Sequence, residues 1–193
     1  MRGGKRSLLD CEVLACGYGL MPNLELAGVL GCAIEHGAVA VDRWQQTSPP
    51  AIFCAGEGTG IGGVDLALAE GNIAGRAAVG ARAPDAQLFA ERARWHAFAA
   101  RLARAFVLRP ELRQLCDGSN ARTIVCRCED VSHGELLQHR SWRSAKLHTR
   151  CGMGPCQGRI CGPASEFLFE WQAESVRPPI FPARVESVGR LVP

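Results

Sequence analysis

Four cysteines in two widely separated pairs are the feature that most limits how this chain can fold. Cys126 and Cys128 form a C-x-C pair, and Cys156 and Cys161 form a C-x₄-C pair in a glycine-rich stretch. Thiolates gathered from distant segments suit Zn²⁺ or an iron–sulfur cluster. Residues five apart on an ideal helix point about 140° apart, so the second pair requires a loop that turns into a helix start. The spacing therefore predicts a metal centre in the second half of the chain.

The spacing alone leaves three interpretations open for these thiols. Zinc sites most often use C-x₂₋₄-C pairs on both sides, which makes this pattern less typical of zinc. An iron–sulfur cluster, a zinc ion and free or redox-active thiols all remain open at this point.

The chain contains ten cysteines but no pattern typical of secretion. Asp10 and Glu12 interrupt the apolar run near the N-terminus after only two leucines, and no stretch approaches the roughly 20 apolar residues of a membrane helix. We therefore expect a reducing, cytoplasmic location, where clustered cysteines more often bind metal than one another. The remaining cysteines lie in or near apolar runs, and we interpret five of them as small buried hydrophobic residues: Cys11, Cys16, Cys32, Cys54 and Cys116.

Length and composition indicate an ordinary globular protein of one domain or two small ones. The chain has 193 residues, of which 47% are apolar and 21% charged, values that exclude a disordered tail or a coiled coil. A net charge of +3 is too weak to indicate a nucleic-acid partner. Residues 1–85 carry a net charge of −3 and residues 86–193 one of +6, which suggests two units with different tasks.

The first half alternates between strand and helix patterns, which predicts an α/β fold. We expect a helix over 24–30 with Asn23 as its cap, and strands over 38–41 and 52–55. Two further helices are predicted, one from Val64 to about Arg82 and a long one from Asp85 to about Val107.

A glycine-rich turn follows the second predicted strand. Gly58, Gly60 and Gly63 match G-x-G-x-x-G, although no second strand with an acidic end follows as in a first dinucleotide-binding motif. Such a turn presents backbone N–H groups and the positive end of a helix dipole. It suits a phosphate, a flavin ring edge, or a ribityl hydroxyl held by Glu57. The alternative is a tight turn that packs helix on sheet without any ligand.

Two segments of the first half resemble motifs of flavoproteins that have two dinucleotide-binding domains. Residues 47–57, TSPPAIFCAGE, resemble their second flavin-binding motif, and residues 14–23, LACGYGLMPN, resemble the segment that precedes it. The resemblance implies FAD as cofactor, with Gly56 and Glu57 at the ribityl chain. The flavin ring would then lie beside Gly63, Val64 and Asp65. Glu57 stands where Asp is usual, so its reach is one methylene longer.

The second half resembles a small, mainly helical [2Fe–2S] domain of the bacterioferritin-associated-ferredoxin type, in the version fused to FAD oxidoreductases. Residues 124–165 carry the likeness, through CRCEDV and TRCGMGPCQG. The resemblance implies that Cys126, Cys128, Cys156 and Cys161 are the cluster ligands. Cys151 occupies a position where alanine is also common in relatives, so it is left out as a ligand and remains the first substitute.

The order of the two parts resembles the FAD/[2Fe–2S] subunit of opine oxidase, hydrogen cyanide synthase and dye-linked proline or hydroxyproline dehydrogenases. This resemblance implies the electron-transfer portion of an oxidoreductase that acts on amino acids, opines or related amines, with a companion flavoprotein subunit. The relatives begin with a G-x-G-x-x-G half that this sequence lacks. The chain therefore looks like a C-terminal portion, and we expect it to bind FAD weakly or not at all without the missing N-terminal portion.

The predicted organisation has four parts. Residues 1–83 form the C-terminal part of an FAD/NAD(P)-binding domain, 84–120 a helical linker, 121–175 the [2Fe–2S] domain and 176–193 a tail. The fold class is therefore a partial two-dinucleotide-binding-domain α/β fold followed by a small helical domain. Two alternatives remain: a non-catalytic metal-binding module, and an inactive truncated fragment. No residue is assigned a catalytic role, and the substrate stays open.

Overall fold

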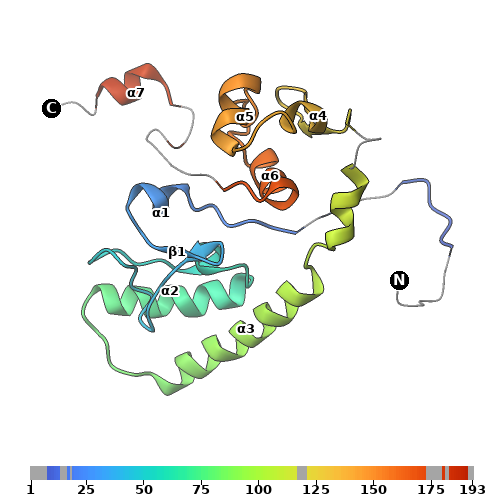
Figure 1. Cartoon of the computed structure of the whole chain (residues 1–193). Coiled ribbons are helices and arrows are strands. Elements are labelled where there is room, and N and C mark those ends of the chain that lie inside the picture. The colour runs from blue at the N-terminus through green and yellow to red at the C-terminus, as the bar shows by residue number, and fades with distance from the viewer. Residues whose placement is uncertain are drawn as a thin grey trace.

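The computed structural model describes residues 8–13, 17, 19–116, 121–172, 180 and 183–190 of the chain. Within these residues helices and turns predominate, and both sheets are two-stranded and antiparallel. Figure 1 shows one group of elements around residues 25–105 and another around residues 124–169. The mixture of helices and small sheets agrees with the coarse α/β prediction. A parallel sheet is not formed by the described residues.

The first elements are short. Helix α1 spans Glu25–Val29, and strands β1 (Ile34–Glu35) and β2 (Ala38–Val39) form a hairpin. Leu24, not Asn23, precedes α1, and no side chain caps it. The predicted Asn23 cap is wrong because the backbone is already helical at Leu24, which leaves Asn23 one residue too far from the first helical N–H groups.

The strand predicted over 52–55 is reduced to local pairing. The N–H of Thr47 donates to the carbonyl of Ile52 at 2.9 Å, and the N–H of Cys54 donates to the carbonyl of Gln45 at 3.0 Å. The bridge at Phe53 is an isolated one. A buried strand needs a neighbour on each side, and the described residues supply only the segment 45–47. The apolar residues over 52–55 therefore do not form part of a regular sheet among the described residues.

The glycine-rich turn leads into the main helix of the first half. The 3₁₀ turn η1 spans Gly56–Thr59, and helix α2 spans Val64–Ala78. Helix α2 ends before the predicted Arg82, because Gly80 takes a positive φ that stops the helix. Its buried apolar face recurs at helical spacing and consists of Leu66, Ala69, Ile73 and Ala77. This face packs against the next helix, α3.

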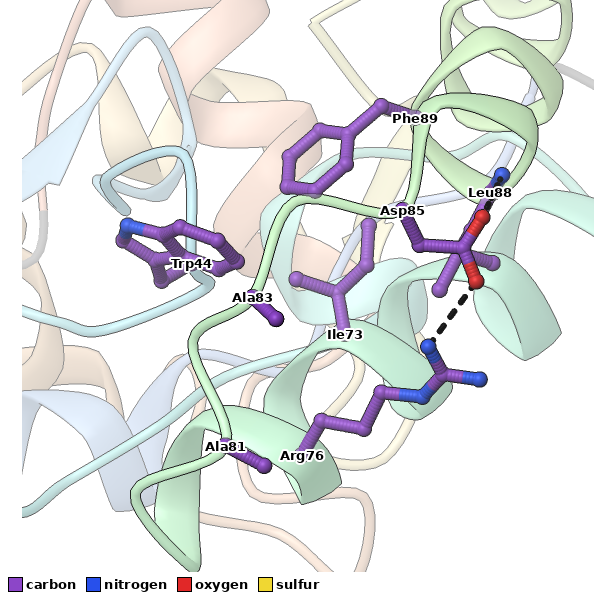
Figure 2. Close-up of a pocket in the computed structure, with 8 residues that line it drawn as sticks. All are labelled: Trp44, Ile73, Arg76, Ala81, Ala83, Asp85, Leu88 and Phe89. Carbon is purple, nitrogen blue, oxygen red and sulfur yellow. Dashed lines mark hydrogen bonds and ion pairs between the residues drawn. The ribbon is translucent and has the colours of Figure 1, made fainter.

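Helix α3 spans Ala86–Ala105, close to the predicted range. The Asp85 carboxylate caps it by accepting from the N–H of Leu88 at 3.0 Å, and it pairs with Arg76 of α2 at 2.9 Å. The Leu88 N–H and the Arg76 guanidinium lower the pKa of Asp85. Figure 2 shows this pair beside Ile73 and Phe89, whose ring meets Trp44 edge to face. The cap and the aromatic contact fix α3 against the rest of the first half.

The second half contains a small core that includes sulfur. Its elements in order are η2 (Pro110–Cys116), β3 (Ile124–Cys126), β4 (Val131–Ser132), α4 (His133–Leu136), α5 (Trp142–Thr149), α6 (Cys161–Phe169) and α7 (Val185–Gly189). The buried core combines apolar residues with cysteines: Val125, Cys126, Val131, Leu136, Ala145, Cys151 and Cys161. So few apolar residues make a small core, which favours additional stabilisation by a metal.

Two ion pairs connect segments of the chain that lie far apart in the sequence. Arg159 pairs with Glu25 of α1 at 3.4 Å, and Arg113 of η2 pairs with Glu170 at 3.2 Å. The Glu25–Arg159 pair joins α1 to the loop that precedes α6. Within the described part, none of the helices combines the length and the apolar character that crossing a lipid bilayer requires.

Candidate functional site

The first two cysteines of the centre come from a hairpin. Strand β3 ends at Cys126, which is buried and pairs with Val131 of β4. Cys128 lies in the connecting turn and is exposed. An ion pair of 2.6 Å between Arg127 and Asp130 closes this turn. The hairpin therefore directs one thiol into the core and holds the other at the surface.

The remaining cysteines lie on a sharply turned loop between α5 and α6. Arg150 ends α5 in the left-handed conformation, and Gly152, Gln157 and Gly158 also have positive φ. Helix α6 then begins at Cys161. The prediction of a loop that turns into a helix start is confirmed.

Two glycines allow this loop to approach its neighbours closely. A Cβ atom at Gly154 would overlap the Cβ of Cys128, and one at Gly152 would lie 2.6 Å from the Trp142 ring. Real Cβ atoms essentially never show contacts this short. Glycine at these positions is therefore a condition for bringing the loop against the C-x-C hairpin.

All five cysteines of the second half after residue 120 gather at this junction, in two groups. The sulfur atoms of Cys126, Cys151 and Cys161 lie within 4.8 Å of one another, and all three residues are buried. The thiols of Cys128 and Cys156 are linked by a hydrogen bond nearer the surface. The structure thus collects the four predicted ligands and adds Cys151 to them. Which four thiolates hold a metal stays a prediction.

The thiols differ in acidity. The hydrogen bond to Cys151 and burial together raise the pKa of Cys161. Burial also raises the pKa of Cys156, but N–H donation from Ile160, Gly158 and Arg159 and the hydrogen bond with Cys128 outweigh it, and the net shift is downward. The start of α6 therefore favours a thiolate at Cys156, as expected where open N–H groups meet sulfur.

The sulfur arrangement fits a thiolate-bound metal. A tetrahedral ion with metal–sulfur bonds of about 2.3 Å separates its ligand sulfurs by about 3.8 Å. The three buried sulfurs already lie within 4.8 Å of one another, so shifts of about 1 Å or less would complete such a geometry. The donor set, all sulfur, suits zinc or iron–sulfur chemistry.

The glycine-rich loop leaves a helix start open. Gly63 precedes α2 with a φ of 84°, and no side chain caps the helix. Val64, Asp65 and the η1 residue Glu57 are exposed around it. These residues present backbone N–H groups and a carboxylate on one side, which is compatible with the flavin interpretation. Their role at FAD stays a prediction.

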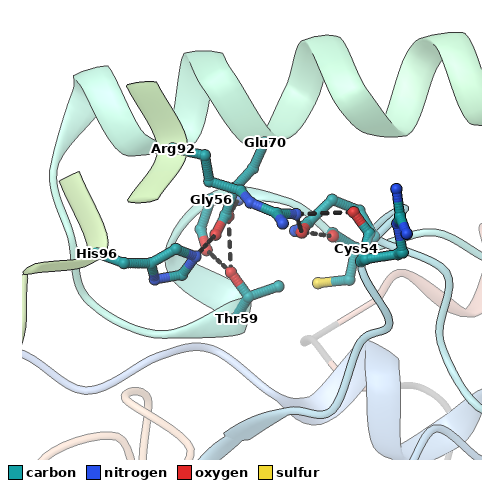
Figure 3. A network of polar contacts seen from close by, with 8 residues as sticks. Cys54, Gly56, Thr59, Glu70, Arg92 and His96 are labelled. Atoms are coloured by element: carbon teal, nitrogen blue, oxygen red, sulfur yellow. Dashed lines mark hydrogen bonds and ion pairs between the residues drawn. The ribbon is translucent and has the colours of Figure 1, made fainter. Parts of the chain in front are cut away.

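Glu70 is a residue of this region that sequence reasoning missed. Its side chain is fully buried on α2, where one oxygen accepts from the Gly56 N–H at 2.8 Å and from the Thr59 hydroxyl at 2.7 Å. The other oxygen faces His96 of α3 at 3.4 Å, as Figure 3 shows. Glu70 thereby fixes η1, and with it Glu57, against α2. The available signal was a carboxylate on the apolar face of a predicted helix.

The cysteines interpreted as buried hydrophobic residues have different outcomes. Cys32 is buried and Cys54 is half-buried, whereas Cys11 is exposed, so that expectation is wrong for Cys11. The isolated segment around Cys11 has no described neighbour to cover it. Cys16 and the side chain of Cys116 lie outside the described residues, as do positions 14–16 and 18 of the predicted flavin-associated segment.

Comparison with known proteins identifies curated relatives. The chain is 35% identical over 171 residues to the HcnB subunit of hydrogen cyanide synthase from Pseudomonas aeruginosa, a match that covers 79% of this chain and 36% of the relative. It is 30% identical to an opine oxidase subunit of Rhizobium meliloti, covering 90% of this chain and 43% of the relative. The corresponding figures for the opine oxidase subunit of Agrobacterium tumefaciens are 26%, 97% and 42%.

The chain thus spans about two fifths of the length of the curated relatives it matches. No protein-family model matches it. No solved structure matches it.

Proposed function

The chain belongs to the family that includes the HcnB subunit of hydrogen cyanide synthase and the matching subunit of opine oxidase, and on this basis we propose that it is the electron-transfer portion of an FAD- and [2Fe–2S]-dependent oxidoreductase. The observation that carries the proposal is the gathering of five cysteines from two distant segments at one junction. FAD exchanges two electrons and a [2Fe–2S] cluster passes one at a time, so together they convert one kind of transfer into the other.

We assign the cluster to Cys126, Cys128, Cys156 and Cys161. The buried Cys126 and Cys161 would hold one iron and the outer pair Cys128 and Cys156 the other, because the sulfurs fall into these two groups. Burial of the first pair excludes water from one side of the site. The outer pair, nearer the surface, leaves the other side accessible to an electron acceptor.

We assign the flavin to the open start of α2. Gly56 and Glu57 would contact the ribityl chain, and Gly63, Val64 and Asp65 would border the ring. Glu70 supports this assignment indirectly, because its hydrogen bonds to Gly56 and Thr59 hold the η1 turn that carries Glu57. The sequence offers no further glycine-rich motif of this kind for the pyrophosphate, so tight FAD binding requires additional polypeptide.

The first partner that this assignment requires is a polypeptide that corresponds to the part of the relatives that this chain does not match. Leu68 of α2 is 67% exposed, and such a partner would cover this apolar side chain. A companion flavoprotein subunit would oxidise the substrate, for which amino acids, opines and related amines are the proposed class. The free thiols required by the cluster favour the cytoplasm.

The decisive experiment is anaerobic purification of the full chain, with analysis of iron and sulfide and with EPR spectra after reduction. We expect two irons per chain and a rhombic signal. Cys156→Ser should abolish the signal, whereas the matched variant Cys32→Ser, at a buried cysteine outside the centre, should retain it. Protein that cannot take up iron and sulfide would refute the proposal.

A further inference from the structure

The centre contains five thiols where a [2Fe–2S] cluster needs four. The additional thiol belongs to Cys151, whose side chain is 0% exposed and lies among the sulfurs of Cys126 and Cys161. A residue that served only to fill the core would not need a sulfur within 4.8 Å of two others. Cys126, Cys151 and Cys161 therefore form a second set of possible metal ligands, which shares Cys126 and Cys161 with the ligands assigned to the cluster.

We propose that Cys126, Cys151 and Cys161 form a binding site for a single Zn²⁺ ion, which competes with the [2Fe–2S] cluster for two of these ligands. Three sulfurs within 4.8 Å of one another match three corners of one tetrahedral ion, whose ligand sulfurs lie about 3.8 Å apart. The two irons of a cluster instead take two cysteines each, so three sulfurs in one group exceed what one iron of the cluster uses. The three cysteines supply three of the four ligands of a tetrahedral ion.

The backbone holds Cys151 in this place independently of any ion. Its N–H donates to the Thr149 hydroxyl at 3.2 Å, and that hydroxyl donates to the carbonyl of Ala145 at 2.7 Å. On its other side, Gly152 lies so close to Trp142 that the chain there has no room for a Cβ atom. The loop just after α5, the end of β3 and the first residue of α6 thus each contribute one sulfur to a preformed set.

The zinc ion and the cluster would both use Cys126 and Cys161, but each would add different cysteines to them. Zinc would use Cys151 with Cys126 and Cys161, whereas the cluster would use Cys128 and Cys156 with them. Binding of the zinc ion displaces three thiol protons to solvent and involves no electron transfer. Because Cys126 and Cys161 cannot serve both, the two forms of the protein exclude each other, and the supply of zinc relative to iron and sulfide selects between them.

The proposal is tested on the full chain, reduced and freed of metal under anaerobic conditions. Zn²⁺ is titrated against a chromophoric chelator, and Co²⁺ serves as a spectroscopic substitute whose thiolate charge-transfer and d–d bands report the number of sulfur ligands. In the wild-type chain we expect one ion per chain and the bands of a tetrahedral site with thiolate ligands. Loss of an outer hydrogen-bond partner of a metal ligand costs 10–100-fold in affinity, so Cys151→Ser, which removes a ligand itself, should weaken zinc binding by more than about 100-fold.

Two variants should respond in opposite ways. Cys151→Ser should lose zinc but still take up iron and sulfide, and Cys128→Ser should lose the cluster but bind zinc as the wild type does. Cys151→Ala, with circular dichroism of both Cys151 variants, separates loss of a ligand from loss of the fold. Wild-type zinc affinity in the Cys151 variants, or a wild-type Co²⁺ complex without thiolate bands, overturns the proposal. A chain that binds zinc through Cys151 but never takes up iron supports the zinc site and refutes both the cluster and the competition with it.

Discussion

At the scale of single residues, Glu70 and Gly154 show how one side chain, or its absence, positions a site. The apolar pattern of α2 predicted which face is buried, but not that a carboxylate on that face would hold the η1 turn. Gly56 and Thr59, which donate to Glu70, lie 14 and 11 residues before it in the sequence. The spacing of apolar residues within a helix does not predict hydrogen bonds to residues outside that helix. The cysteines were easier to recognise, because metal binding restricts their spacing.

Replacing Glu70 tests its role in holding the turn. Glu70→Ala leaves the Gly56 N–H without its acceptor, whereas the Thr59 hydroxyl keeps the Gly56 carbonyl; an unsatisfied buried donor costs about 1–3 kcal/mol. We expect the free energy of unfolding to fall by at least this amount in urea titrations. The control Glu57→Ala, at an exposed carboxylate in the same turn, should change it by less than about 0.5 kcal/mol. Equal effects of the two substitutions would contradict the assignment.

Gly154 offers a test of the close approach at the metal centre. Gly154→Ala places a methyl group against the Cβ of Cys128, so Cys128 or the loop must shift. We expect the iron content after anaerobic reconstitution to fall to less than about half, since metal ligation needs distances within ±0.2 Å. Gly162→Ala is the matched control, because nothing lies within 4 Å of its added Cβ atom. Full iron content in Gly154→Ala would show that the loop adapts.

At the scale of helices and strands, prediction succeeded where the signal was local. Asp85 predicted the start of α3, and the long apolar spacing predicted its extent, because both depend on residues within a few turns. The strand over 52–55 failed for the opposite reason, since a strand depends on neighbours elsewhere in the sequence. The positive φ of Gly80 ended α2 early, a turn signal that the continued alanines concealed.

The capping box of α4 gives a prediction at this scale. The Ser132 hydroxyl accepts from the Glu135 N–H, while the Glu135 carboxylate accepts from the Ser132 N–H at 2.8 Å. Ser132→Ala should reduce the free energy of unfolding by about 0.5–2 kcal/mol. The control Ser187→Ala, on the exposed surface of α7, should have less than about 0.5 kcal/mol of effect.

The same capping box should depend on pH. Donation from the Ser132 hydroxyl and N–H lowers the pKa of Glu135 below its ordinary 4.5. A lowered pKa means that the contribution to stability is complete well above pH 4.5 and is lost as the pH falls through the pKa of the folded state. The difference between wild type and Ser132→Ala in urea titrations should therefore shrink in acid. A difference that is the same at about pH 7 and about pH 3 would exclude this contribution from Glu135.

At the scale of the whole molecule, the two halves differ in how closely they match the folds predicted for them. The thiol-rich half forms its own core in the described residues. The described residues of the first half do not form the parallel sheet that the flavoprotein resemblance implies. The predicted boundaries at 83, 120 and 175 stay predictions.

This contrast predicts different cofactor retention in the two halves. The purified chain should retain FAD weakly, with flavin fluorescence fully released by gel filtration, while the same preparation takes up iron and sulfide. The physical reason is that the open start of α2 can hold part of the flavin but supplies no second phosphate-binding turn. Iron uptake in the same sample shows that the protein is folded. Tight flavin retention by the chain alone would contradict the prediction.

The sulfur cluster joins β3 to the start of α6, so any metal bound there closes the loop of chain between residues 126 and 161. Cross-linking a loop of this size removes conformational entropy from the unfolded chain worth about 4 kcal/mol. That is close to the entire stability of many small domains. The metal-free form should therefore open often enough for proteases to reach it. A cell short of metal would then lose this protein by degradation rather than accumulate an empty form.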